Sequence, residues 1–249
     1  MKQYQLKCFL SMLTLLCFLS TNLDAQYYSG FGNRQKSSIG FSAGSHLGYR
    51  LLSGDNGDDI TSLQIANREK FEVYKPNLRL GISYQHGLNN RFLLITGLGY
   101  SQQGFKFNST EKIDFNSNIN NIEKAFDIDG YNYVYSYQFI EVPIGIKYMA
   151  RRSACTPYIE VGVIPSLYTS TLVTEETPSG NSKKSNVDEA ISKVNLMGFF
   201  TFGGDIALSQ KTAAFTQLHG RYQFNNLRTG NLEEQLISLG VDVGFRIYL

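Results

Sequence analysis

Eight charged residues share one side of an alternating pattern of polar and apolar residues, so their side chains could meet. Four are positive and four are negative: Arg79, Lys147, Arg221 and Arg246, and Glu141, Glu160, Asp205 and Asp242. In a confined space these side chains would form ion pairs, because an unpaired buried charge costs several kcal/mol. His46 and His219 lie on the same side and can join the set. We expect a lumen charge cluster built from these residues.

The chemistry of this set depends on whether the space around it is open or filled. Ion pairs that hold a filled interior closed are the interpretation we favour. A space that conducts protons or solutes is the alternative. His46, Asp205 and one of the serines could be drawn as a hydrolase triad, but the sequence has no nucleophile elbow. We therefore expect no enzymatic activity.

Metal-ligand spacings are absent from the sequence. Once an N-terminal export signal is removed, Cys155 is the only cysteine, and the three histidines are scattered along the chain. The acidic stretch Asp55–Asp59 lacks the distant glutamate of a calcium loop. Asn108-Ser109-Thr110 fits a glycosylation sequon, but we favour a plain polar loop. We expect no metal and no other cofactor.

The segment Phe139–Tyr148 shows most clearly which elements must position these charges. Its even positions are Ile140, Val142, Ile144, Ile146 and Tyr148, all apolar, whereas its odd positions include Glu141 and Lys147. A period of two residues over this length is typical of a β-strand with one apolar and one polar face.

The same alternation recurs along the chain and predicts eight strands. Their expected ranges are 38–50, 73–86, 91–107, 133–149, 157–171, 193–208, 213–224 and 236–249. The connections between them alternate between long and short, with long ones at 51–72, 108–132, 172–192 and 225–235. Four long loops on one side and three short turns on the other are typical of an antiparallel up-and-down transmembrane β-barrel.

Alternation alone does not decide which face of such a barrel points outward. A soluble, lipocalin-like barrel would turn the apolar face inward, but eight strands enclose room for few large side chains. The polar face is rich in Gly, Ser and Gln, which suit a narrow interior. Aromatic residues also gather at both ends of the apolar face, as at the two interfaces of a membrane: Tyr49, Tyr74, Tyr100, Tyr222 and Phe224 at the loop ends, and Tyr84, Phe92 and Tyr148 at the turn ends.

The N-terminal residues 1–25 are typical of a cleaved signal peptide. Lys2 and Lys7 precede the apolar run Cys8–Leu19, and the small residue Ala25 ends the segment. An uncleaved anchor is the alternative, but the run is short for a spanning helix. Residues 26–249 then form a single barrel domain. The net charge of +2, without a block of like charges, gives no support to nucleic-acid binding.

Two neighbouring predicted strands carry a motif of a known family. FIEVPIGIKY, a short turn and PYIEVGVIPSL resemble the PorT-like outer-membrane β-barrel family through Glu141, Val142, Pro143, Lys147, Tyr148, Pro157, Tyr158, Glu160 and Gly162. The terminal GVDVGFRIYL is similar to strands that the barrel-assembly machinery recognises, although it ends in Leu249 rather than an aromatic residue. The resemblance implies an eight-stranded barrel in a Gram-negative outer membrane, in a family whose best-known member assists secretion.

From the residues and the resemblance together we expect a non-enzymatic outer-membrane barrel. It would act as an envelope scaffold or as an accessory to transport or secretion machinery. A small passive channel, or a barrel that binds ligands through its surface loops, is the alternative. The expected partners are outer-membrane lipid, the barrel-assembly machinery during insertion, and envelope or secretion proteins. Because Glu141, Lys147 and Glu160 fall on adjacent strands, we also expect them to form one cross-strand cluster.

Overall fold

The computed structural model describes residues 37–54, 71–108, 132–150, 155–176, 182–187, 191–228 and 232–249. The expected signal peptide and the acidic stretch Asp55–Asp59 lie outside these residues. No helix within the described ranges is long and apolar enough to cross a membrane. The strands are β1 (Ser37–Gly54), β2 (Glu72–Gly87), β3 (Phe92–Gln103), β4 (Phe105–Asn108), β5 (Asn132–Glu141), β6 (Ile144–Met149), β7 (Cys155–Glu176), β8 (Ser182–Val187), β9 (Val194–Ala207), β10 (Thr212–Gln223) and β11 (Leu232–Tyr248).

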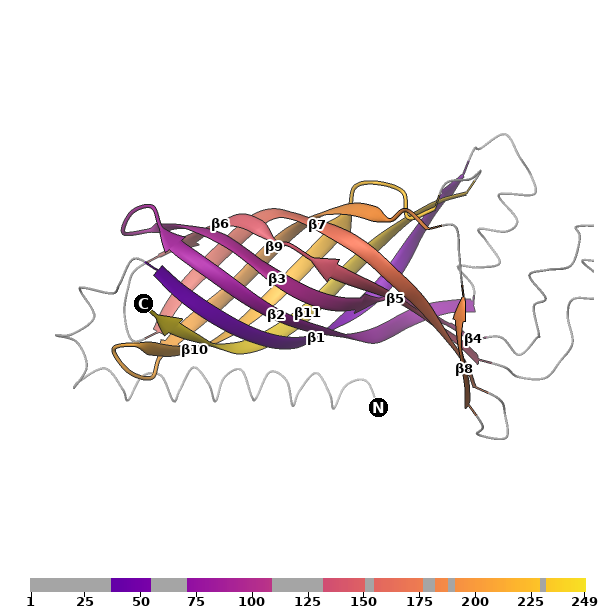
Figure 1. Cartoon of the computed structure of the whole chain (residues 1–249), viewed down its shortest axis with the longest axis horizontal. Coiled ribbons are helices and arrows are strands. Elements are labelled where there is room, and N and C mark those ends of the chain that lie inside the picture. Colours follow the sequence, from indigo (N-terminus) through magenta and orange to yellow (C-terminus); the bar gives the residue numbers. More distant parts are fainter. Residues whose placement is uncertain are drawn as a thin grey trace, which may run out of the picture.

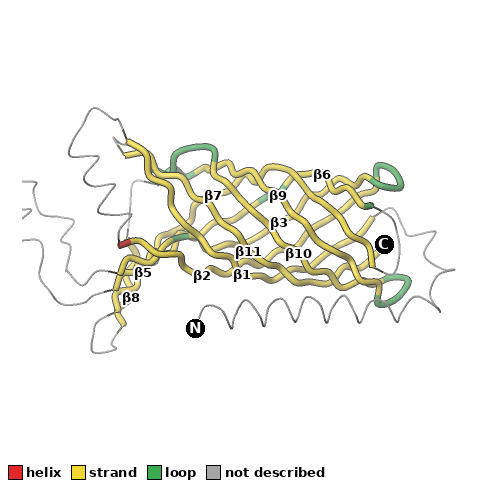
Figure 2. The backbone as a smooth tube through the Cα atoms, turned by 180° about the vertical axis from the view of Figure 1, so that it is seen from behind, coloured by secondary structure: helices red, strands yellow, loops and turns green. Residues whose placement is uncertain are grey.

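All of these strands belong to one antiparallel sheet that closes on itself. β1 pairs with β2 on one side and with β11 on the other, from Ser38 opposite Tyr248 to Gly54 opposite Leu232. The circuit continues from β2 through β3, β5, β7, β9 and β10 back to β11. A sheet whose first and last strands pair is a barrel. Its strands run obliquely along one long axis (Figure 1), as the view from behind also shows (Figure 2).

The two ends of the barrel differ. The tight connections β2–β3 and β9–β10 and the C-terminus lie at one end, here called the turn end, whereas β4 and β8 lie at the other, the loop end (Figure 1). Side-chain oxygens close both short turns. Asn89 Oδ1 accepts hydrogen bonds from the backbone N–H groups of Arg91 and Phe92, and Ser209 Oγ accepts those of Lys211 and Thr212.

The described residues contain eleven strands where the sequence predicted eight. Part of the difference is β8, which lies within the predicted loop 172–192 and pairs with an extension of β7 through Glu176. Its sequence, SKKSNV, has no apolar alternation that would reveal it as a strand. β11 likewise begins at Leu232, inside the predicted loop 225–235.

The other two additional strands arise because two predicted strands are interrupted. Gly104 separates β3 from β4 and has a φ of 155°, and a Cβ atom there would collide with the carbonyl oxygen of Tyr135. Val142 and Pro143 separate β5 from β6. Proline has no N–H group to donate to a neighbouring strand, so the ladder is broken at that position.

The apolar face of the sheet is the outer surface of the barrel. Along β11, Leu239 and Val243 are 56% and 57% exposed, whereas Asp242 and Arg246, on the opposite face, are 0% and 1% exposed. This is the reverse of a soluble barrel, whose apolar face would be buried. The outer surface therefore suits lipid, and the interior is polar.

Aromatic side chains occupy both ends of this apolar surface. At the loop end the rings of Tyr49 and Tyr74 lie 4.9 Å apart, and Tyr222 contacts Phe224 at 5.9 Å. At the turn end the rings of Phe92 and Tyr148 lie 5.2 Å apart. Amphipathic aromatic rings at these two levels match the interfaces of a bilayer.

Candidate functional site

The eight predicted charged residues all project into the interior of the barrel. All except Arg79 are buried, and the Arg79 side chain is 12% exposed. They come from β2, β5, β6, β7, β9, β10 and β11, so residues from distant parts of the sequence converge inside the barrel. The structure divides them into two groups of four.

The first group, the turn-side cluster, consists of Lys147, Glu160, Asp205 and Arg246. Lys147 Nζ lies 3.5 Å from Glu160 Oε1 and 3.3 Å from Asp205 Oδ2. Arg246 Nη1 donates a hydrogen bond to Asp205 Oδ1. The ammonium of Lys147 also lies 3.3 Å from the centre of the Tyr158 ring, a cation–π contact. Two positive and two negative charges therefore compensate each other here.

The second group, the central cluster, consists of Arg79, Glu141, Arg221 and Asp242. Arg79 Nη1 lies 2.5 Å from Asp242 Oδ2, and its Nε lies 3.6 Å from Glu141 Oε2. Arg221 Nη1 donates a hydrogen bond of 2.8 Å to Glu141 Oε1. The charges again balance, two against two. Glu141 joins both arginines and is therefore the centre of the group.

Neutral side chains complete the coordination of the central carboxylates. Ser101 Oγ donates to Glu141, and Gln217 Nε2 donates to Asp242 Oδ2 over 2.9 Å. His219 Nδ1 lies 3.3 Å from the same Asp242 oxygen, and the His46 ring lies 6.0 Å from that of His219. Both histidines therefore join this cluster.

The prediction that Glu141, Lys147 and Glu160 form one cluster is wrong for Glu141. Lys147 and Glu160 face each other in the β6–β7 register, but Glu141 pairs with the two arginines of the central cluster. The reason is distance along the strand. Positions 141 and 147 are six residues apart, which corresponds to about 20 Å at ~3.3 Å per residue.

A third ionic group, the loop-end cluster of Arg50, Glu72 and Glu234, was not predicted. Arg50 Nη1 lies 2.9 Å from Glu234 Oε1, Arg50 Nη2 donates to Glu72, and the guanidinium lies 3.9 Å from the Phe105 ring centre. Both glutamates fell in predicted loops. Glu234 has the same parity as Asp242, so continuing the alternation two residues further would have placed it inside. Nothing comparable in the sequence marks Glu72.

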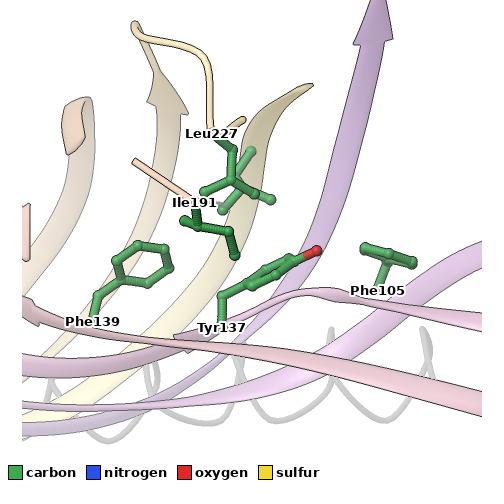
Figure 3. Packing of buried hydrophobic residues seen from close by; sticks show 6 residues of the cluster. Phe105, Tyr137, Phe139, Ile191 and Leu227 are labelled. Atoms are coloured by element: carbon green, nitrogen blue, oxygen red, sulfur yellow. The ribbon is translucent and has the colours of Figure 1, made fainter. Parts of the chain in front are cut away.

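An apolar layer lies in the interior at the loop end. Phe105, Tyr137 and Phe139 come from β4 and β5, and Leu236 comes from β11. Ile191 and Leu227, outside the strands, reach over them (Figure 3). Tyr137, Phe139 and Leu227 are fully buried. This layer obstructs the interior on the loop side of the charged groups.

Little space remains between the charged groups. The interior cavity beside them has a volume of about 50 Å³ and is lined in part by Arg79, Glu160, His219, Arg221 and Arg246. That volume suits a few water molecules rather than a solute. Within the described ranges, no group of three or more His, Cys, Asp or Glu side chains could hold a metal ion.

Comparison with known families agrees with this architecture. Residues 25–228 match the family described as outer membrane protein beta-barrel domain. The chain belongs to this family. Its fold is therefore an antiparallel outer-membrane β-barrel, and its location is the outer membrane of a Gram-negative bacterium.

Several solved outer-membrane barrels are similar to this family member along most of its length. Neisserial surface protein A is 10% identical, with 87% of this chain and 99% of that one covered and a TM-score of 0.44. OprG from Pseudomonas aeruginosa is 8% identical, with coverages of 88% and 98% and a TM-score of 0.47. Ail of Yersinia pestis is 11% identical, with coverages of 86% and 100% and a TM-score of 0.36. No curated protein matches the chain.

Proposed function

We propose that this outer-membrane protein is a closed, non-enzymatic barrel that acts as an envelope scaffold or as an accessory to transport or secretion machinery. The observation that carries this proposal is the filled interior. Ion pairs occupy its centre and turn side, an apolar layer occupies its loop side, and the cavity beside the charges is only about 50 Å³. A barrel with a filled interior can act through contacts at its outer surface and at its two ends, rather than as a channel.

We infer that this barrel crosses the membrane eight times. β3 and β4 continue one another across Gly104, and β5 and β6 continue one another across Val142 and Pro143, so each pair counts as one crossing. β8 pairs only with the loop-end extension of β7 among the described strands. Eight strands enclose an interior just wide enough to be filled by side chains, which agrees with the packing found here.

The accessory role is proposed from the resemblance of one sequence motif to PorT-like barrels, a family whose best-known member assists secretion. Glu160 of that motif pairs with Lys147, and Glu141 joins the two central arginines. These motif residues therefore stabilise the interior rather than contact a partner. We propose that partner contacts lie outside the motif, at the loops or the short turns.

Crosslinking in intact cells tests this proposal directly. The tagged barrel is purified from detergent-solubilised outer membranes after mild crosslinking, and the copurifying proteins are identified. A stoichiometric envelope or secretion component is the expected result. Purification of the barrel as a monomer without copurifying proteins would contradict the accessory role. Large single-channel conductance in a planar bilayer would contradict the closed interior.

A surface ligand-binding barrel is the second candidate, and the β7–β8 hairpin favours it. Ser182–Ser185 of β8 are exposed at the loop end, and they include Lys183 and Lys184. Replacing both lysines by glutamate should leave the interior unaffected. The measurement compares how strongly cells with the variant barrel and cells with the unchanged barrel attach to a surface. A difference in attachment, together with unchanged copurification of partner proteins, would favour this candidate.

A further inference from the structure

The lipid-facing wall of the barrel contains a hollow where a side chain is missing. Gly220 of β10 faces outward, between Phe200 of β9 and Leu239 of β11 in the register. Both neighbours carry large, exposed side chains, at 55% and 56% exposure. The hollow has a volume of about 730 Å³ and continues toward Tyr49 and Tyr222. It is called the Gly220 groove below.

The Gly220 groove is almost entirely apolar and opens toward the loop-end aromatic residues. Leucine, isoleucine, phenylalanine and tyrosine side chains form its walls, together with the glycine backbone. Arg221 also contributes to the lining, but its guanidinium is directed into the interior, where it binds Glu141. No charged group of the lining therefore faces outward to bind a polar ligand.

We propose that the Gly220 groove binds one acyl chain of a lipid in the outer leaflet. The groove is continuous with the surface that contacts the membrane, so lipid is the medium that meets it. Its lining includes Tyr49 and Tyr222 of the loop-end aromatic girdle, the level of the lipid head groups, whereas Leu239 lies deeper in the wall. A linear chain entering from the head-group level matches both the chemistry and the direction of this hollow.

A chain in the groove differs from lipid beside a position where two large side chains meet. Phe202 and Leu218 form such a position, because they project outward and face each other in the register. In the groove, Phe200, Leu239 and Tyr222 surround the chain on several sides. More atoms of the chain are then in van der Waals contact, and these contacts add up. A lipid held there should exchange more slowly than its neighbours.

The absence of tryptophan from the chain provides a clean test. Phe200→Trp places a single fluorescent reporter in the groove, and Phe202→Trp places a matched reporter on the same strand, where Ile159 and Leu218 are its outward neighbours. The barrel is reconstituted in phosphatidylcholine vesicles that contain a small fraction of phosphatidylcholine with brominated acyl chains. We expect stronger quenching of the groove reporter than of the matched reporter. Equal quenching would overturn the proposal.

Filling the groove tests whether the excess quenching comes from it. The Cβ atom of a residue at position 220 would meet nothing closer than 4.0 Å, so Gly220→Leu fills the groove without a backbone collision. Gly204→Leu is the control, because a Cβ there also meets nothing within 4 Å and the residue lies outside the groove lining. We expect Gly220→Leu to remove the excess quenching and Gly204→Leu to retain it.

Folding and assembly state are measured on the same samples. Both leucine variants should show the heat-dependent gel shift of a folded barrel. Loss of the excess quenching in both variants would overturn the proposal, as would its persistence in Gly220→Leu. If the wild-type barrel is instead a dimer that Gly220→Leu dissociates, the groove is a contact between two copies and the lipid proposal fails.

Discussion

Lys147 and Glu160 face each other directly across β6 and β7, and their charged atoms lie 3.5 Å apart inside the barrel. Lys147 is fully buried and also contacts Asp205 and the ring of Tyr158. Asp205 has a second cation, Arg246, whereas Lys147 is the cation that the structure places beside Glu160. The pairing of Glu160 therefore depends on Lys147.

Replacing Lys147 by methionine should destabilise the folded barrel. The substitution keeps a long side chain but leaves Glu160 buried without this cation, and breaking a buried pair in this way costs about 3 to 5 kcal/mol. We expect the heat-dependent gel shift to occur at a lower temperature. Lys147→Arg keeps the positive charge, so the temperature of its gel shift should fall less than that of Lys147→Met. Unchanged heat resistance of Lys147→Met would contradict the role of the turn-side cluster.

Glu141 and Arg221 should be energetically coupled in the central cluster. Glu141→Gln leaves Arg221 without its carboxylate at 2.8 Å, and Arg221→Met leaves Glu141 with Arg79 as its remaining ion-pair partner. Each single substitution should lower the free energy of unfolding by about 3 to 5 kcal/mol. The double variant should lose less than the sum, because the second change removes a charge that the first left unpaired. Urea unfolding in detergent micelles measures the cycle, and strictly additive losses would contradict direct pairing.

The faces of the strands could be predicted from the sequence, but the pairing of the charges could not. A two-residue period places Glu141 and Lys147 inside whatever their neighbours are, because successive side chains point to opposite faces. Which inward residues meet depends on the tilt and stagger of the strands around the barrel. Alternation carries no information on stagger, so Glu141 was assigned to Lys147 rather than to Arg79 and Arg221. The loop-end cluster was concealed for another reason, because Glu72 and Glu234 lie near the starts of their strands, within the ranges 51–72 and 225–235 predicted as loops.

Gly240 should tolerate no larger residue. A Cβ atom there would collide with the Cβ of His46 and lie 2.7 Å from the backbone oxygen of Ser45. The backbone contact cannot be relieved by a rotamer change, and overpacking of this kind costs about 1 to 3 kcal/mol. We expect Gly240→Val to reduce the yield of folded barrel in the outer membrane. Gly204→Val, whose Cβ meets nothing within 4 Å, is the control and should fold normally. Equal yields would contradict the close approach of β1 and β11.

The interior should stay closed to ions when it is opened at one level, because other levels remain filled. Tyr137 and Phe139 close the loop side, and Lys147 with its partners fills the turn side. Tyr137→Ala combined with Phe139→Ala removes two rings of the apolar layer but leaves the charged groups in place, so we expect no large conductance in a planar bilayer. Lys147→Ala alone leaves the apolar layer intact and should also give no large conductance. The triple variant keeps the central cluster of Arg79, Glu141, Arg221 and Asp242 between the two levels, so it should also give no large conductance. Conductance from either partial variant would show that the other obstruction does not close the barrel.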